Sequence, residues 1–382
     1  MYLPDTLFFQ WLSISWYRGM AISIRLATES DNQGLIALAR KSPMKGLLTL
    51  YIDRAPDFFS LNRLQGDPWR VYVAQDAEQV VGSISIAYRD VFAWGTTTRI
   101  AYLSDMKILP SYRSSTVAFR LIKAVHEYEH TTGADYFICS VIKGNESVMK
   151  LFHGRAGLPR MYAVGEVVIH NIIPVFRKQM NGQDSVREAK TEDAAQMKSL
   201  FEKFSQHYNF TPKLEENYFR RIIQHEEPFQ NSNHFVSERA GTMVAMASTW
   251  DQMSMKNLVV EKHSIASRSL VYFSKLAAFT GIMPRLPDAG KVIRTLQMRH
   301  LAIDEGGESG LREILKCVYN ICLERRYHVL QIVVAEGDPI ASVLPRSLTT
   351  RVPLIIFCGS ISRQSTMEAL SERKCYEDIC LV

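Results

Sequence analysis

The sequence contains little cysteine, and none of it is arranged for metal binding. Its 382 residues include six cysteines, with no C-x-x-C pair: Cys139, Cys317, Cys322, Cys358, Cys375 and Cys380. This spacing argues against a zinc site and against a disulfide framework. Cys139 and Cys358 lie in apolar, strand-like runs. We therefore expect reduced, buried thiols, as in a cytoplasmic protein, and no bound metal.

Long apolar runs and long basic runs are also absent. No apolar stretch reaches the about 20 residues that span a bilayer, so we expect no membrane partner. The 45 basic and 39 acidic residues give a net charge of +6 without a basic block, which argues against nucleic-acid binding. A content of 47% hydrophobic and 22% charged residues is that of a globular protein, and the length suits two domains.

The first 21 residues lack the features of a secretory signal. They are apolar and aromatic, but they have no basic start and no small-residue cleavage site. Met20 stands directly before Ala21 and the first strand-like run. We interpret residues 1–21 as an N-terminal extension. Two explanations stay open for it, a misplaced start codon and a hydrophobic tail that docks on the surface.

What the sequence does contain is an internal repeat. The run from Ile24 to Asp31 recurs from Val186 to Asp193, with Arg, Ala and Asp matching at an offset of 162 residues (187 − 25). Each copy predicts a strand and then a helix that begins at a Ser, Thr or Asp cap. A predicted hairpin then repeats with an offset of 163 residues (244 − 81), at residues 71–75 and 80–86 and at residues 234–238 and 243–247.

The repeat predicts two domains with one layout. Strand-like runs at residues 136–141 and 328–333 stand 192 residues apart (328 − 136), so the second copy holds an insertion of about thirty residues. We expect a first domain at residues 22–172, a linker at 173–184 and a second domain at 185–382, with the insertion around 250–290. A helix predicted at residues 269–279 either covers the core or forms a substrate lid or dimer face.

Residues 97–132 carry the clearest candidate for a binding site. Arg99 to Leu109 is rich in strand-forming residues, and Val117 to His130 repeats apolar residues at helical spacing. Pro110 ends the strand, and Ser114 to Thr116 supply hydroxyls at the helix entrance. The first backbone N–H groups of a helix have no partner inside it. Such an entrance binds anions, phosphate above all.

The predicted order in the first half is strand, helix, helix, hairpin, long strand, phosphate-facing helix, strand, helix and final strands. In this order the whole first half resembles the GNAT superfamily of acyl-CoA-dependent N-acetyltransferases. The family's signature, Q/R-x-x-G-x-G/A after a strand that ends in V-x-P, is similar to Ile108-Leu109-Pro110 followed by Arg113 to Ala118. The family's next helix begins with Asn, as at Asn145. The resemblance implies an α/β fold (α+β by some schemes) of two tandem GNAT-like domains, each a mixed, mostly antiparallel sheet flanked by helices.

The resemblance also implies a function. It is the transfer of an acetyl or other short acyl group from acetyl-CoA to a primary amine of a small molecule, peptide or protein, by direct attack of the amine on the thioester. The expected acyl-CoA-binding residues are Met106, Ile108, Arg113, Ser114, Ser115, Thr116, Val117, Ala118 and Asn145. The alternative is a non-catalytic protein of the same fold that binds acyl-CoA and serves sensing or scaffolding.

Acyl transfer to an amine needs a group that takes the amine's proton, and a proton donor helps the thiolate to leave. Asp105 is our candidate base, because family members often carry a carboxylate at this point of the strand. Phe152 replaces the family's usual Tyr, so the donor stays unassigned. Thr116 replaces the family's first Gly, and its side chain either crowds the phosphate or donates a hydrogen bond to it.

The second copy departs further from the family pattern. Its equivalent loop, residues 304–310, is rich in glycine but carries three carboxylates beside the expected pyrophosphate, where like charges repel. We interpret this half as a degenerate copy that supports the first half and shapes the acceptor pocket. Tandem copies can imitate the two-fold pairing of single-domain relatives, and a homodimer is also compatible with the sequence.

Overall fold

The computed structural model describes residues 22–44, 46, 48–129, 133–154, 160–180, 184–264, 285–361 and 373–382. The predicted N-terminal extension and the predicted helix at residues 269–279 lie outside these residues.

The first half follows the predicted order of strands and helices. Its main elements are β1 (Ser23–Leu26), α1 (Asn32–Arg40), β2 (Leu48–Asp53), α2 (Asn62–Gln65), β3 (Trp69–Asp76), β4 (Gln79–Ala93), β5 (Thr96–Ile108), α3 (Val117–Glu129), β6 (Tyr136–Ile142), α4 (Glu146–Met149) and β7 (Tyr162–Ile173). The predicted strand and helix of residues 97–132 are thus present as β5 and α3.

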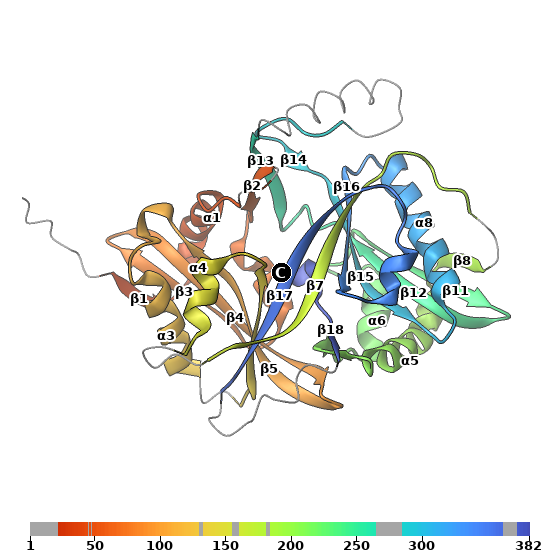
Figure 1. The fold of residues 1–382 in the computed structure, drawn as a ribbon, viewed down its shortest axis with the longest axis horizontal. Helices are drawn as coiled ribbons and strands as arrows, with labels where there is room; N and C mark the ends of the chain where they lie inside the picture. Colours follow the sequence, from red (N-terminus) through yellow and green to blue (C-terminus); the bar gives the residue numbers. More distant parts are fainter. Residues whose placement is uncertain are drawn as a thin grey trace, which may run out of the picture.

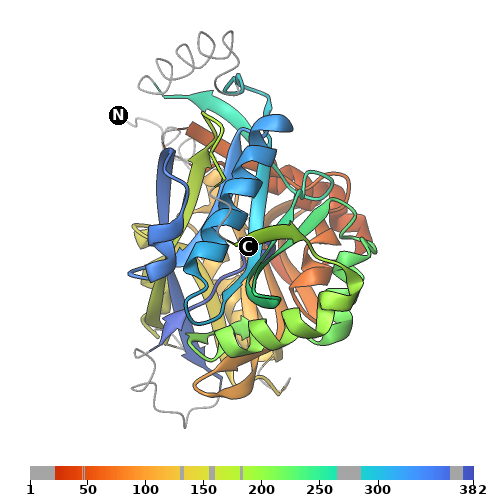
Figure 2. The same ribbon diagram turned by 90° about the vertical axis from the view of Figure 1, so that its right-hand side faces the viewer.

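The second half repeats this order with additions. Its main elements are β8 (Ser185–Glu188), α5 (Ala194–Ser205), β9 (Tyr208–Asn209), β10 (Thr211–Pro212), α6 (Glu216–Ile223), β11 (Ser232–Arg239), β12 (Thr242–Trp250), β13 (Asn257–His263), β14 (Val292–Ile293), β15 (Thr295–Ile303), α8 (Glu308–Glu324), β16 (Val329–Ala335), β17 (Leu348–Ser360) and β18 (Lys374–Cys375). α8 and α5 both pack against β12 and β15, and both lie in the part of the molecule that faces the viewer in Figure 2.

One mixed sheet of 13 strands runs through the molecule and is flanked by helices (Figure 1). Its strand order is β1-β3-β4-β5-β6-β17-β7-β16-β15-β12-β11-β8, and β10 pairs with the far end of β4. The β5–β6 and β15–β16 pairs are parallel, and the other described pairs of this sheet are antiparallel. The predicted α/β fold class with a mixed, mostly antiparallel sheet is confirmed.

The matching Arg and Asp of the sequence repeat make the same contact in both halves. Arg25 pairs with Asp31 at 2.7 Å, and Arg187 pairs with Asp193 at 2.7 Å. Each aspartate also accepts a hydrogen bond from the backbone N–H three residues earlier, at the beginning of the helical segment. In each half, this ion pair therefore connects the first strand to the beginning of the first helical segment.

The two halves exchange a strand at the centre of the sheet. β17 comes from the second half, yet it pairs with β6 on one side and with β7 on the other. β7, from the first half, pairs on its far edge with β16 of the second half. Figure 1 shows β17 and β7 side by side across the middle of the molecule. The linker at residues 173–184 thus separates the two halves in the sequence, although their strands share one sheet. The two-domain boundary stays a prediction.

Two further pairings join the halves. β2 of the first half pairs with β13 of the second, in a separate three-stranded sheet with β14. β10 of the second half pairs with β4 of the first. In each half, therefore, the segment that follows the first helix lies against the other half. Arg54 directly follows β2 and Lys256 directly precedes β13, so this pairing brings the two residues to the same region of the molecule.

The buried apolar side chains form two clusters. One gathers side chains of α1, α3, β3 and β4, and the other gathers α5, α6, α8 and the second-half strands. The second cluster also takes in Ile100 and Tyr102 of β5, so the cores meet across the sheet. All six cysteines are free thiols; five of them, including Cys139 and Cys358, are buried, and Cys317 is half-buried. None of the described helices combines the length and apolar character needed to cross a membrane.

Candidate functional site

The parallel strands β5 and β6 diverge toward their carboxyl ends. They pair only at residues 100–102 and 136–138, although β5 continues to Ile108 and β6 to Ile142. On their outer edges both strands stay paired, β5 with β4 and β6 with β17. Among the described residues, no strand pairs with the inner edges of the diverging parts, so a ligand can use their backbone groups.

The turn after β5 leads into the exposed beginning of α3. The carbonyl oxygen of Thr116 accepts from the backbone N–H of Arg120 at 2.9 Å, which makes Thr116 the residue that caps the helix. Oγ of Ser115 accepts from the N–H of Val117 at 3.3 Å. Ser114, Ser115 and Thr116 are exposed, whereas Val117 is buried. The predicted phosphate-binding turn therefore faces solvent at the open end of β5.

The other predicted cofactor residues border the same opening. Met106 and Ile108 lie half-buried on the diverging part of β5. Arg113 Nε donates to the carbonyl oxygen of Ile108 at 3.3 Å, which holds the arginine across the end of the strand. Asn145 is exposed and directly precedes α4, shortly after β6. Because β5 and β6 are parallel, the turns that follow them lie at one edge of the sheet.

Asp105 lies on a bulge of β5. The register between β4 and β5 shifts opposite this residue, which has a positive φ of 49°. Aspartate tolerates this left-handed conformation better than most residues. A bulge re-aims the side chain of the strand on which it lies. Here it places the Asp105 carboxylate, with 9% of the side chain exposed, against two cations.

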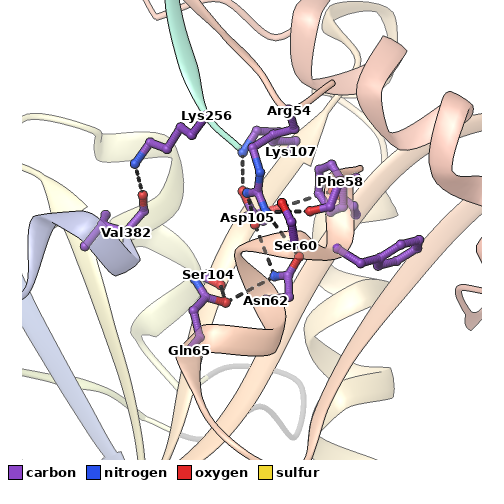
Figure 3. A network of polar contacts seen from close by, with 12 residues as sticks. Arg54, Phe58, Ser60, Asn62, Gln65, Ser104, Asp105, Lys107, Lys256 and Val382 are labelled. Carbon is purple, nitrogen blue, oxygen red and sulfur yellow. Dashed lines mark hydrogen bonds and ion pairs between the residues drawn. The ribbon is translucent and has the colours of Figure 1, made fainter. Parts of the chain in front are cut away.

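The two cations are Arg54 and Lys107 (Figure 3). Arg54 Nη1 donates to Oδ2 of Asp105 at 3.0 Å, and Lys107 Nζ donates to Oδ1 at 2.8 Å. Burial alone would raise the pKa of Asp105, but Lys107 and Arg54 outweigh it and hold the pKa well below its usual range. So acidic a carboxylate is a weak proton acceptor. The catalytic role predicted for Asp105 thus gains no support from its pKa.

The second half of the chain reaches the same network. Gln65 accepts from Ser104 Oγ at 3.0 Å and donates through Nε2 to the carbonyl oxygen of Leu381 at 2.7 Å. Lys256 Nζ donates to the carbonyl oxygen of Val382 (Figure 3). Burial and, to a smaller extent, the charge of Arg54 together lower the pKa of Lys256 to about 8. The site therefore lies where the two halves meet.

Sequence reasoning missed most of this network. Arg54, Gln65 and Lys256 come from segments far from Asp105, and no local pattern connects them. Lys107 could have been found, because residues two apart on a strand share a face. Phe152, where the family usually has Tyr, is 8% exposed and packs on Phe357 with ring centroids 4.8 Å apart. Its ring belongs to the core.

The equivalent opening in the second half is filled by the chain itself. β15 and β16 pair only at residues 295–297 and 329–331. Beyond that point, Arg299 pairs with Asp378 at 2.6 Å, and the short helix η8 (Ile379–Leu381) contacts both strands. At the beginning of α8, Asp184 accepts from Ser309 Oγ at 2.5 Å. A segment of chain and a carboxylate thus occupy the places that the first half leaves open.

The comparisons with known proteins agree with this geometry. Residues 46–157 match the model of the acetyltransferase (GNAT) family. The match assigns residues 46–157 to the GNAT superfamily. Among the described residues, no group of three or more His, Cys, Asp or Glu side chains is placed to hold a metal ion.

Two curated plant proteins are similar to part of the chain. A probable N-acetyltransferase HLS1-like protein of Arabidopsis thaliana is 26% identical over 95 residues, which are 25% of this chain and 22% of that protein. The probable N-acetyltransferase HLS1 of the same plant is 24% identical over 95 residues, 25% of this chain and 23% of that protein. The match thus spans less than a quarter of these relatives.

A solved structure extends the likeness to most of the chain. Saccharomyces cerevisiae N-myristoyltransferase with bound myristoyl-CoA has a TM-score of 0.57 to this protein at 11% identity, covering 88% of this chain and 82% of that one. At this identity the likeness shows a shared fold.

Proposed function

We propose that this protein transfers an acetyl or other short acyl group from acyl-CoA to a primary amine. The observation that carries the proposal is the opening between β5 and β6, which ends at the exposed beginning of α3. In this proposal the pantetheine arm lies along Met106 and Ile108. The pyrophosphate lies against residues 113–118, with Asn145 across the opening. The free cysteines suit a cytoplasmic setting.

The reaction would proceed by direct attack. The amine nitrogen forms a bond to the thioester carbon, the C–S bond breaks, and coenzyme A leaves as a thiolate. Water takes the proton of the amine in this scheme, because Asp105 is too acidic to do so. Arg54, Lys107 and Lys256 all interact with the one carboxylate of Asp105, which offsets only one of their three charges. Their excess positive charge would stabilise the negative charge that develops on the carbonyl oxygen and the sulfur.

Non-catalytic binding of acyl-CoA is the second candidate, and two observations favour it. Phe152 has no proton to give, and the pKa of Asp105 lies well below its usual range. Calorimetry with acetyl-CoA tests binding, and release of free thiol with a panel of primary amines tests transfer. Binding without thiol release would establish the second candidate. The similar yeast enzyme is described with bound myristoyl-CoA, so the acyl chains tested should run from acetyl to myristoyl.

A charge variant at the α3 entrance tests the location of the cofactor. Ser114→Asp places a carboxylate at a helix beginning, which the helix tolerates. It should weaken coenzyme A binding about tenfold through repulsion of the phosphates. Glu305→Gln in the exposed second-half loop is the control and should leave affinity unchanged. Unchanged coenzyme A affinity in Ser114→Asp, or tighter binding in Glu305→Gln, would refute binding of the cofactor at the beginning of α3.

A further inference from the structure

A small pocket adjoins the Asp105 network on its second-half side. Gln252, Lys256, Thr295 and Gln297 line it together with three apolar side chains. The two glutamines are almost fully buried, with 2% of Gln252 and 5% of Gln297 exposed. The phosphate and pantetheine contacts proposed above leave this pocket unused.

The amide oxygens of both glutamines have no hydrogen-bond partner in the part of the chain that the structure describes. Nε2 of Gln252 donates to the carbonyl oxygen of Cys380 at 2.7 Å, and because a carbonyl only accepts, this bond fixes which way the amide faces. Nε2 of Gln297 donates to Gln331 at 3.2 Å, whose own Nε2 donates to Asn171 at 2.7 Å. Neither Oε1, of Gln252 or of Gln297, has a hydrogen-bond partner among the described residues. Buried oxygens of this kind favour a ligand that donates N–H bonds.

Lys256 determines which charge the ligand can carry. It lines the pocket and lies close enough to Arg54, Asp105 and Lys107 for their charges to affect it (Figure 3). Three cations against one carboxylate disfavour a further positive charge. An uncharged amine is therefore preferred over an ammonium ion, and the uncharged form is the one that attacks a thioester.

We propose that this pocket binds the uncharged amino group of the acceptor substrate, with Oε1 of Gln252 and Oε1 of Gln297 accepting its two N–H bonds. The proposal rests on the acyl transfer proposed above and names the residues that recognise the acceptor. Two N–H bonds to the protein leave the nitrogen lone pair available for attack. A hydroxyl group has one donor and would leave one of the two oxygens unpaired, so the pocket selects amines over alcohols.

Fluorine NMR with two small probes tests the proposal on the full chain. Trifluoroethylamine is uncharged at neutral pH and has two N–H donors, whereas its N,N-dimethyl derivative has none. Saturable binding is expected for the first probe only. Gln297→Met keeps the size of the side chain but removes the oxygen, and it should weaken binding about three- to tenfold. Asn320→Leu removes a buried amide elsewhere and should leave probe binding unchanged.

Two results would overturn the pocket proposal. One is equal binding of the two probes, and the other is unchanged binding in both Gln297→Met and Gln252→Leu, as expected if the pocket holds a single ordered water only. Calorimetry with acetyl-CoA on the same proteins separates this failure from failure of the proposed function. Coenzyme A binding without probe binding refutes the pocket alone. Absence of coenzyme A binding refutes the acyl transfer, whatever the probe does.

Discussion

Replacing Asp105 with Asn should destabilise the protein severely, because it leaves two buried cations without their carboxylate. Arg54 is 1% exposed and Lys107 is 13% exposed, so water cannot take the place of the lost partner at Arg54. Removing one member of a buried ion pair costs about 3–5 kcal/mol. We expect a loss of about 4 kcal/mol in the free energy of unfolding at pH 7, measured by urea denaturation. Most of the loss should come from Arg54.

The difference between the wild type and Asp105→Asn should depend on pH. The folded-state pKa of Asp105 lies below that of an aspartate in the unfolded chain, about 3.9. Its stabilising contribution is therefore complete above that value and is lost progressively as the pH falls below it. The two stability curves should run parallel from about pH 7 to pH 5 and converge in stronger acid.

Asp90→Asn is the matched control. It removes a pair with Arg99 at 3.3 Å, in which the side chains are 49% and 38% exposed, on the same β4–β5 hairpin. Such exposed pairs contribute about 0–1 kcal/mol. A loss in Asp105→Asn no greater than that in Asp90→Asn would refute the buried-pair reasoning. Thiol release with an unchanged pH profile in Asp105→Asn would also exclude Asp105 as the base.

Three further predictions concern other parts of the molecule. Burial lowers the pKa of His234 to about 3, so the free energy of unfolding should fall by roughly 1.4 kcal/mol per pH unit below about pH 6.5. In urea titrations, His234→Gln should flatten this slope, whereas the control His207→Gln, at an exposed position, should not. Thr116→Gly should weaken coenzyme A binding about threefold if its exposed hydroxyl donates to the phosphate, whereas tighter binding in calorimetry would mean that the side chain crowds the site. Asp378→Asn breaks the buried pair with Arg299, so the free energy of unfolding should fall by about 3 kcal/mol and hydrogen exchange in residues 376–382 should become faster. Unchanged exchange would contradict the proposed filling of the second opening.

The sequence allowed the elements to be predicted where the signal was local. The β5–α3 unit follows from strand-forming residues, one proline and a helical repeat within a single stretch. The repeat around Arg25 and Asp31 could be recognised because its pattern recurs as Arg187 and Asp193, and both pairs form. The fold class followed from the resemblance to the GNAT superfamily, and the family match and the structure confirm it.

The arrangement of the halves and most of the site could not be predicted, because they depend on long-range pairing. Nothing in the composition of β17 shows that it pairs between β6 and β7 rather than within its own half. Arg54 meets Asp105 across 51 positions of sequence, and Lys256 reaches the network through the β2–β13 pair. Such contacts depend on the order of strands in the finished sheet, which the local residues do not encode.

The two halves use the same backbone feature for different chemistry. Asp105 on β5 and His300 on β15 both lie opposite a register shift and both have positive φ, 49° and 52°. Asp105 is an ionised carboxylate between two cations, whereas burial holds the pKa of His300 well below its usual range, so it stays neutral. His300 hydrogen-bonds to Ser248 and Tyr218 at 3.3 Å and 3.2 Å.

As a result, the opening in the first half is lined by charged side chains, whereas the one in the second half is closed by packed residues. The first opening is bordered by the ionic network, and no described segment pairs along its inner edges, whereas residues 376–382 fill the second opening. The same segment accepts hydrogen bonds from Gln65 and Lys256, at the backbone oxygens of Leu381 and Val382. Closing the second opening thus positions the segment that completes the site of the first. Loss of the Arg299–Asp378 pair should therefore reduce activity as well as stability, although neither residue borders the β5–β6 opening.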